Sequence, residues 1–156
     1  MVNPAEQRIL DDVEQFGWHI ICVGPAADSD DPEEWFAYTI GLSKTFGWSE
    51  LICFGLDLQV MGNLLNDAVE ECRTTKVEPS HGLTLRNVIQ GFPAKLVHND
   101  TLADEYVNSA LWFARHEGVS RPTVLQLLWP DRDGYFPDES GCSNEVRQLQ
   151  TPLEHR

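Results

Sequence analysis

Three short segments rich in apolar, β-branched and aromatic residues follow one another before a second helical pattern begins. They span residues 18–23, 35–42 and 51–54. Strands joined by connections this short pair as antiparallel neighbours, whereas a parallel pair needs a crossover that usually contains a helix. The sequence therefore favours an antiparallel or mixed sheet over a succession of βαβ units.

Residues that typically begin or end helices appear at three places along the chain. Residues 3–17 open with Asn, Pro and Glu in the order of an N-cap, a first-turn proline and a capping box, and they close on Gly. Residues 57–72 start with a capping Asp, and their apolar residues recur at spacings of three and four. A third helix is predicted to begin near Asp100 or Thr101 and to end at Gly118, with basic residues in its last turn.

Further strands are predicted at residues 83–89, 94–97 and 123–129. We therefore expect a single α+β domain over residues 1–140, with a sheet of about five to six strands and three helices mainly on one face. Residues 141–156 lack periodicity and are expected to form a C-terminal tail with little order.

The charge balance narrows the range of partners. The 156 residues include 11 Lys and Arg against 25 Asp and Glu, a net charge of −14. Such a field repels phosphate backbones and anionic lipid, so we expect no nucleic-acid partner and no membrane association, and a basic protein partner is the better match. The N-terminal segment lacks a signal-peptide pattern and the cysteines form no C-x-x-C pair, which favours a reduced, cytoplasmic protein.

Common ligand-binding motifs are missing from the sequence. It has no glycine-rich nucleotide loop and no H-E-x-x-H, and its histidines are not at metal-ligand spacing, so we predict no cofactor and no metal. Asp131, Asp133 and Gly134 have some likeness to a calcium loop, but the Gly and Glu that an EF-hand needs further along are absent. An Asx turn is favoured there, with weak cation binding as the alternative.

Polar residues inside or at the ends of the predicted strands are the candidate binding residues, because such groups gather over a rigid scaffold. Gln126 is a clear case, since a polar side chain inside a sheet must find a partner. The full set is Tyr38, Thr39, Gly41, Glu50, His81, Gln126, Trp129, Asp131, Asp133 and Gly134. We expect segments 38–42 and 129–131 to meet at one end of a shared sheet and to form a cleft.

The residues Tyr38-Thr39-Ile40-Gly41-Leu42, Glu50-Leu51 and the block from Gln126 to Pro137 resemble a bacterial family catalogued as domain of unknown function forty-two sixty-two. The stretch WPDRDGYFP is the most specific part, and Ser49 stands where the family usually has Pro. The resemblance implies no assigned activity. The Y-T-x-G-L and E-L layout is also distantly similar to suppressor-of-fused-like domains, which act mainly through protein contacts and include bacterial immunity proteins.

Three functional hypotheses follow. The favoured one is a non-catalytic binding module, immunity-like, whose cleft holds a protein segment or a small ligand between aromatic and polar groups. The alternative is a small hydrolase or transferase with Glu50, Asp131 and Asp133 as general acid and base, assisted by Tyr38 or His81. The third is a structural or regulatory subunit of a homodimer with tryptophans at its interface.

Overall fold

The computed structural model describes residues 2–24, 35–89, 91–98 and 106–150. These residues form a six-stranded sheet in the order β1-β2-β3-β6-β5-β4. The strands are β1 (His19–Val23), β2 (Phe36–Ile40), β3 (Glu50–Phe54), β4 (Thr84–Ile89), β5 (Phe92–His98) and β6 (Val124–Leu128). The β3–β6 pair is parallel and the other pairs are antiparallel, which confirms the predicted α+β fold with a mixed sheet.

Three longer helices accompany the sheet: α1 (Pro4–Phe16), α3 (Leu58–Thr75) and α5 (Asn108–Glu117). The capping box predicted for α1 is present, because Asn3 Oδ1 accepts from Glu6 N at 2.7 Å and Glu6 Oε1 accepts from Asn3 N at 3.0 Å. The Asp57 carboxylate caps α3 as predicted.

The third predicted helix begins later in the structure than the sequence suggested. Tyr106 lies in a turn, and α5 starts at Asn108 and ends at Glu117, with the predicted Gly118 as its C-cap. The predicted starting residues Asp100 and Thr101 lie outside the described residues.

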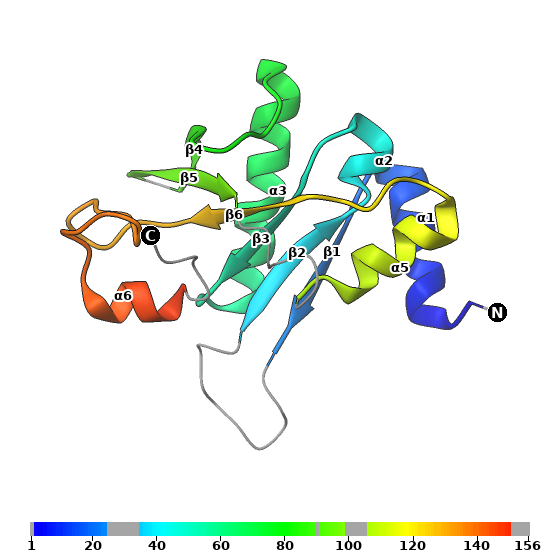
Figure 1. Cartoon of the computed structure of the whole chain (residues 1–156), viewed down its shortest axis with the longest axis horizontal. Coiled ribbons are helices and arrows are strands. Elements are labelled where there is room, and N and C mark those ends of the chain that lie inside the picture. Colours follow the sequence, from blue (N-terminus) through cyan, green and yellow to red (C-terminus); the bar gives the residue numbers. More distant parts are fainter. Residues whose placement is uncertain (1, 25–34, 90, 99–105, 151–156) are drawn as a thin grey trace.

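The helices cover both faces of the sheet. Ala37 and Cys53 pack against α3, whereas their neighbours Tyr38 and Phe54 pack under α1 and α5 (Figure 1). The expectation of helices mainly on one face is therefore corrected. All five residues of β3 are buried, and successive side chains of a strand point to opposite faces, so each face needs its own cover.

The segment from residue 141, expected to be a tail with little order, holds α6 (Asn144–Leu149) among its described residues. The Ser143 side chain caps this helix. Arg147 ties it to the preceding loop by donating to the carbonyl oxygens of Pro137, Glu139 and Cys142. A helix of this length is too short for a hydrophobic period to reveal it.

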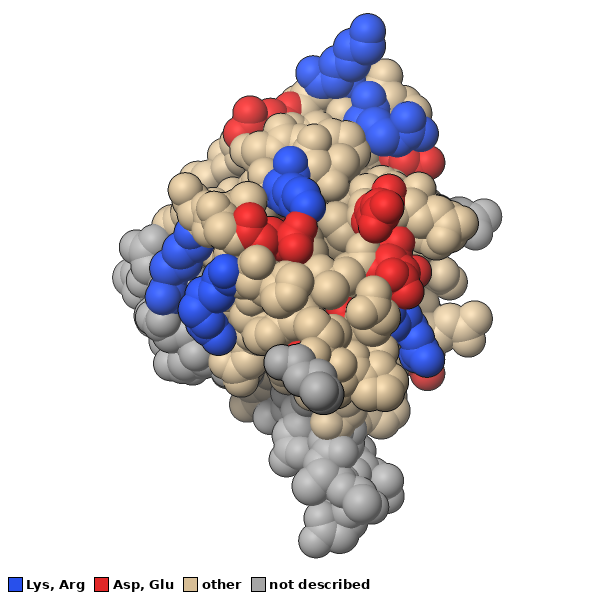
Figure 2. Space-filling view, turned by 90° about the vertical axis from the view of Figure 1, so that its right-hand side faces the viewer, with Lys and Arg blue, Asp and Glu red and all other residues tan. Residues whose placement is uncertain are grey.

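Two properties of the surface bear on partners. None of the helices in the described part of the chain is both long and apolar enough to cross a bilayer. Figure 2 looks onto the end of the molecule that carries α1 and α5, and it shows acidic and basic side chains interspersed there. The net charge of −14 is therefore not gathered into one continuous acidic patch on this face.

Candidate functional site

The two segments that were expected to form one cleft lie at opposite ends of the sheet. Because β3 and β6 are parallel, Glu50 at the start of β3 pairs with Val124 at the start of β6. Asp131 follows the far end of β6, on the side of α6, whereas Glu50 lies on the side of α2 (Leu42–Phe46) (Figure 1). The cleft prediction is corrected, and the candidate residues separate into distinct groups.

The first group surrounds the buried carboxylate of Glu50. Its Oε1 accepts from Thr39 Oγ1 at 2.8 Å and from Leu42 N at 3.2 Å. Its Oε2 accepts from Gly41 N at 3.0 Å and from Ser43 N and Ser43 Oγ at 3.3 Å. Burial raises the pKa of Glu50 to about 7, and the Thr39 hydroxyl and the three N–H groups act in the opposite direction. Both oxygens are thus engaged by the chain's own donors, so Glu50 holds the turn between β2 and α2.

Gly41 serves the same turn by its lack of a side chain. Its φ is +107°, and a Cβ at this position would lie 2.7 Å from Val13 Cγ2. Only glycine combines this backbone angle with so close an approach. Gly41 therefore allows α1 to pack against the β2–α2 turn.

The second group joins Gln126 and Trp129 to a residue that the sequence analysis did not select, Gln150. Gln126 Nε2 donates to the Gln150 carbonyl oxygen at 2.8 Å. The Gln150 side chain accepts from Trp129 N at 3.0 Å and donates to Trp129 O at 2.7 Å. This amide extends the hydrogen bonding of the sheet beyond the end of β6, and we name the arrangement the Gln150 clasp. A single Gln in a segment without periodicity gives no sequence signal for such a role.

The third group is the turn after β6. Asp131 Oδ1 accepts from Asp133 N and Tyr135 N, both at 3.0 Å, and Oδ2 accepts from Ser143 N at 2.9 Å. The Tyr135 N–H, followed by the other backbone donors, lowers the pKa of Asp131. This is the Asx turn that the sequence favoured, and its carboxylate is committed to the loop. Within the described ranges, no cluster of three His, Cys, Asp or Glu side chains is placed to hold a metal ion.

Tyr38 and His81 belong to none of these groups. The Tyr38 hydroxyl is buried and accepts from Ser109 N at 3.2 Å, at the start of α5. His81 Nδ1 accepts from His98 N at 2.9 Å, beside the end of β5. The carboxylates of Glu50, Asp131 and Asp133 are accordingly not brought together as an acid–base set with either residue.

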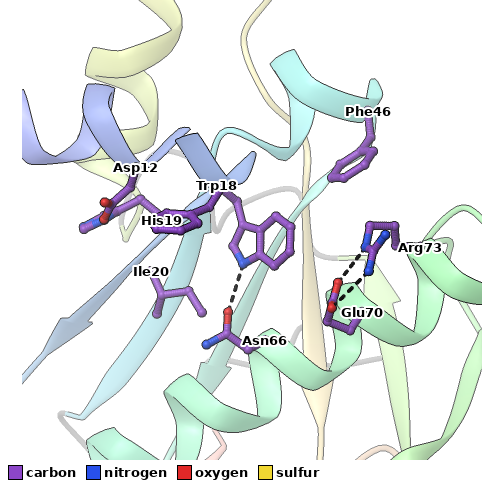
Figure 3. Close-up of a pocket in the computed structure, with 9 residues that line it drawn as sticks. Asp12, Trp18, His19, Ile20, Phe46, Asn66, Glu70 and Arg73 are labelled. Atoms are coloured by element: carbon purple, nitrogen blue, oxygen red, sulfur yellow. Dashed lines mark hydrogen bonds and ion pairs between the residues drawn. The ribbon is translucent and has the colours of Figure 1, made fainter. Parts of the chain in front are cut away.

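A surface hollow of about 700 Å³ lies elsewhere, along the outer side of β1. We name it the Trp18 groove; its lining residues are Asp12, Phe16, Trp18, His19, Ile20, Phe46, Asn66, Glu70 and Arg73. Figure 3 shows the Trp18 indole between the Asp12–His19 pair and the Glu70–Arg73 ion pair of α3. Trp18 Nε1 donates to Asn66 Oδ1 at 2.9 Å, which fixes the indole with its ring in the groove.

The charged residues of the groove are arranged as pairs. His19 Nδ1 lies 2.6 Å from Asp12 Oδ2, and the Asp12 side chain keeps 32% of its surface exposed. Arg73 binds Glu70 through Nε at 2.6 Å and Nη2 at 3.1 Å. The groove thus combines aromatic surface with polar groups held in place, as recognition sites do.

The chain matches the family model described as a domain of unknown function (DUF4262) over residues 12–143. The chain belongs to this family. No curated protein and no solved structure matches it. The more distant likeness to suppressor-of-fused-like domains stays a prediction.

Some of the features described above lie within the region that matches the DUF4262 family model, and others do not. This region contains every residue of the Trp18 groove and the whole sheet. It ends before α6 and Gln150, so the Gln150 clasp is formed by a segment outside the matched region. Residues 18–23 were predicted only as a strand, without a place at the edge of the sheet, because the position of a strand within a sheet depends on long-range pairing.

Proposed function

We propose that this DUF4262 domain is a non-catalytic protein-interaction module that binds an extended segment of a partner as an added strand on the outer edge of β1. The observation that carries the proposal is the direction of the backbone groups of Ile20 and Cys22. Strand addition uses such groups for affinity and the flanking side-chain pockets for specificity.

The direction of these groups follows from the register of the sheet. Gly55 N donates to Trp35 O at 3.0 Å, so odd-numbered residues of β2 direct their N–H and C=O groups toward β3. Even-numbered residues of β2 therefore face β1, where they pair with His19, Ile21 and Val23. The N–H and C=O groups of Ile20 and Cys22 consequently point away from the sheet.

The other edge of the sheet is protected by the chain itself. The Glu71 carboxylate accepts from Arg86 N at 3.3 Å and from Asn87 N at 2.9 Å, and the β4 register shifts between Leu85 and Ile89. Bulges and capped donors are how proteins blunt sheet edges. The β1 register is unbroken over its five pairs, and in the described chain the outward N–H groups of Ile20 and Cys22 have no partner. Of the two edges, β1 is the one that the described residues leave open.

Hollows on both sides of β1 suit the alternating side chains of an added strand. Trp18 and Ile20 face the α3 side and line the Trp18 groove. His19 and Ile21 face α1 and line a second hollow of about 270 Å³, which we name the Ile21 hollow. Phe16, which is 61% exposed at the rim of the Trp18 groove, offers an apolar contact to a partner.

A peptide selection tests the proposal. Dodecamers from a displayed library would be selected on the wild type, and their Kd values measured by fluorescence anisotropy on wild type, Cys22→Pro and Cys22→Ala. Proline at position 22 removes an outward donor without removing a β1–β2 hydrogen bond, and alanine keeps the donor while removing the thiol.

We expect Cys22→Ala to bind as the wild type does and Cys22→Pro to bind at least about tenfold more weakly, the effect of about 1.4 kcal/mol for a lost hydrogen bond. N-methylation of single backbone amides in the selected peptide gives a second readout on intact protein, because alternate positions should weaken binding. Equal binding to all three proteins, together with no effect of N-methylation, would refute strand addition. Failure to select any peptide would count against it too.

A further inference from the structure

The side chains flanking the open edge indicate what kind of strand it accepts. Residues paired across two strands place their side chains on the same face. A partner residue opposite His19 therefore points to the α1 side, and its two neighbours, opposite Trp18 and Ile20, point to the α3 side. Trp18 and the first two residues of β1, His19 and Ile20, thus each face one position of the partner strand.

The α3 side offers apolar surface. Trp18 stands with its ring centroid 6.3 Å from that of Phe46, and Phe46 stacks on Trp48 at 4.2 Å. The one cation on this side of the groove, among the residues that line it, is Arg73, which the Glu70 carboxylate neutralises. Apolar partner side chains opposite Trp18 and Ile20 would bury this aromatic surface.

The α1 side offers a carboxylate at the level of His19. Asp12 lines the Trp18 groove, and its side chain is 32% exposed while that of His19 is 15% exposed. One oxygen, Oδ2, is engaged with His19 Nδ1. A Lys or Arg side chain opposite His19 would reach the exposed part of this carboxylate, and the chain's net charge of −14 favours the approach of a basic segment.

We infer that the partner strand carries a Lys or Arg between two apolar residues, placed opposite His19 and between Trp18 and Ile20, and that Asp12 is the residue that selects the basic side chain. This inference rests on the proposed strand addition at β1. The apolar–basic–apolar order reads the same in both directions, so it holds for a parallel and for an antiparallel partner.

Two fluorescein-labelled peptides test the inference. The first is Thr-Thr-Ile-Lys-Ile-Thr-Thr-amide with the fluorescein on its N-terminal amine, and the second has Glu in place of Lys. Their affinities would be measured on the wild type, Asp12→Asn, Asp12→Lys and Asp11→Asn. Asp11 is the exposed neighbour of Asp12 and lines neither the Trp18 groove nor the Ile21 hollow, so Asp11→Asn changes the net charge equally without touching the site.

We expect the wild type and Asp11→Asn to prefer the Lys peptide by about fivefold or more, because the exchange to Glu removes an attraction and adds a repulsion at a partly exposed site. Asp12→Asn should reduce this preference below about twofold, and Asp12→Lys should reverse it. High salt should shrink the preference as well.

The outcomes separate the two proposals. If both peptides bind wild type equally, and Cys22→Pro weakens both, strand addition stands and the selection by Asp12 is overturned. If Asp11→Asn removes the preference as fully as Asp12→Asn does, general charge and not Asp12 is responsible, and the inference is again overturned. If neither peptide binds, or if Cys22→Pro binds both as the wild type does, strand addition itself fails and the inference fails with it.

Discussion

The Thr39 hydroxyl joins a strand donor to the buried carboxylate of Glu50. It accepts from Leu51 N at 2.9 Å and donates to Glu50 Oε1 at 2.8 Å. The regular pairing of β2 with β3 ends at this point. The Thr39 side chain, in place of a backbone carbonyl oxygen, accepts the hydrogen bond from Leu51 N. Glu50 is thereby coupled to both the sheet and the turn that starts α2.

Replacing Glu50 by Gln should remove a pH dependence of stability. The folded-state pKa is raised by burial to about 7, from an ordinary value of 4.5. Between these values the folded chain holds a proton that the unfolded chain has released, so wild-type stability falls as the pH rises through this window, by up to about 3 kcal/mol. Urea denaturation from pH 4 to 8 measures the difference between wild type and Glu50→Gln, and a constant difference would contradict the expectation.

Gly41→Ala should destabilise the fold more than Gly47→Ala does. Both glycines have positive φ, +107° and +75°, so each substitution carries backbone strain of about 1–2 kcal/mol. At Gly41 the new Cβ also meets Val13 Cγ2 at 2.7 Å, whereas at Gly47 no atom lies within 4 Å. We expect Gly41→Ala to cost about 1–3 kcal/mol more, as overpacking does, measured by chemical denaturation. Equal costs would mean that the turn moves freely away from α1.

Gln150→Ala should open the Gln150 clasp. The change removes both side-chain hydrogen bonds to the Trp129 backbone and is expected to cost about 1–3 kcal/mol. Gln59→Ala makes the same chemical change at an exposed helical position and should cost little. Hydrogen exchange at the Trp129 amide reports the clasp directly, and unchanged protection in Gln150→Ala would show that another group holds this strand end.

Asp131→Asn should destabilise the protein at neutral pH, whereas Asp133→Asn should not. Asp131 accepts three backbone N–H groups, and Asp133 is exposed. Because the folded-state pKa of Asp131 lies below its ordinary value of 3.8, its contribution is present above about pH 4 and is lost as the pH falls through the folded pKa. Thermal unfolding at pH 7 and pH 2.5 should show a wild-type advantage that shrinks in acid. A similar loss in both variants would indicate a general effect of charge.

Features encoded by neighbouring residues could be predicted from the sequence. Asn3, Asp57 and Gly118 mark helix ends because each satisfies backbone groups within its own turn, and the six strands were all anticipated in position. Thr39, Gly41 and Glu50 were selected together and lie together, because β2 and β3 are consecutive antiparallel neighbours joined by the segment that contains α2.

Features that depend on distant pairing could not be predicted. No residue within either strand indicates that β6 runs parallel to β3. This direction places Asp131 and Glu50 at opposite ends of the sheet. The need of Gln126 for a partner was clear, but its partner Gln150 lies in a segment without pattern. The open edge of β1 is likewise a property of strand order and not of the residues in the strand.

The β3–β6 pair also has a consequence for synthesis of the chain. All five residues of β3 are buried in the finished fold, yet the strand that covers one of its edges begins only at Val124. The ribosome adds roughly 5–20 residues per second. For several seconds, therefore, the nascent chain carries the apolar strand β3 with its β6-facing edge unpaired. Chaperone demand should therefore concentrate in that interval, and slowing translation between β3 and β6 should increase aggregation.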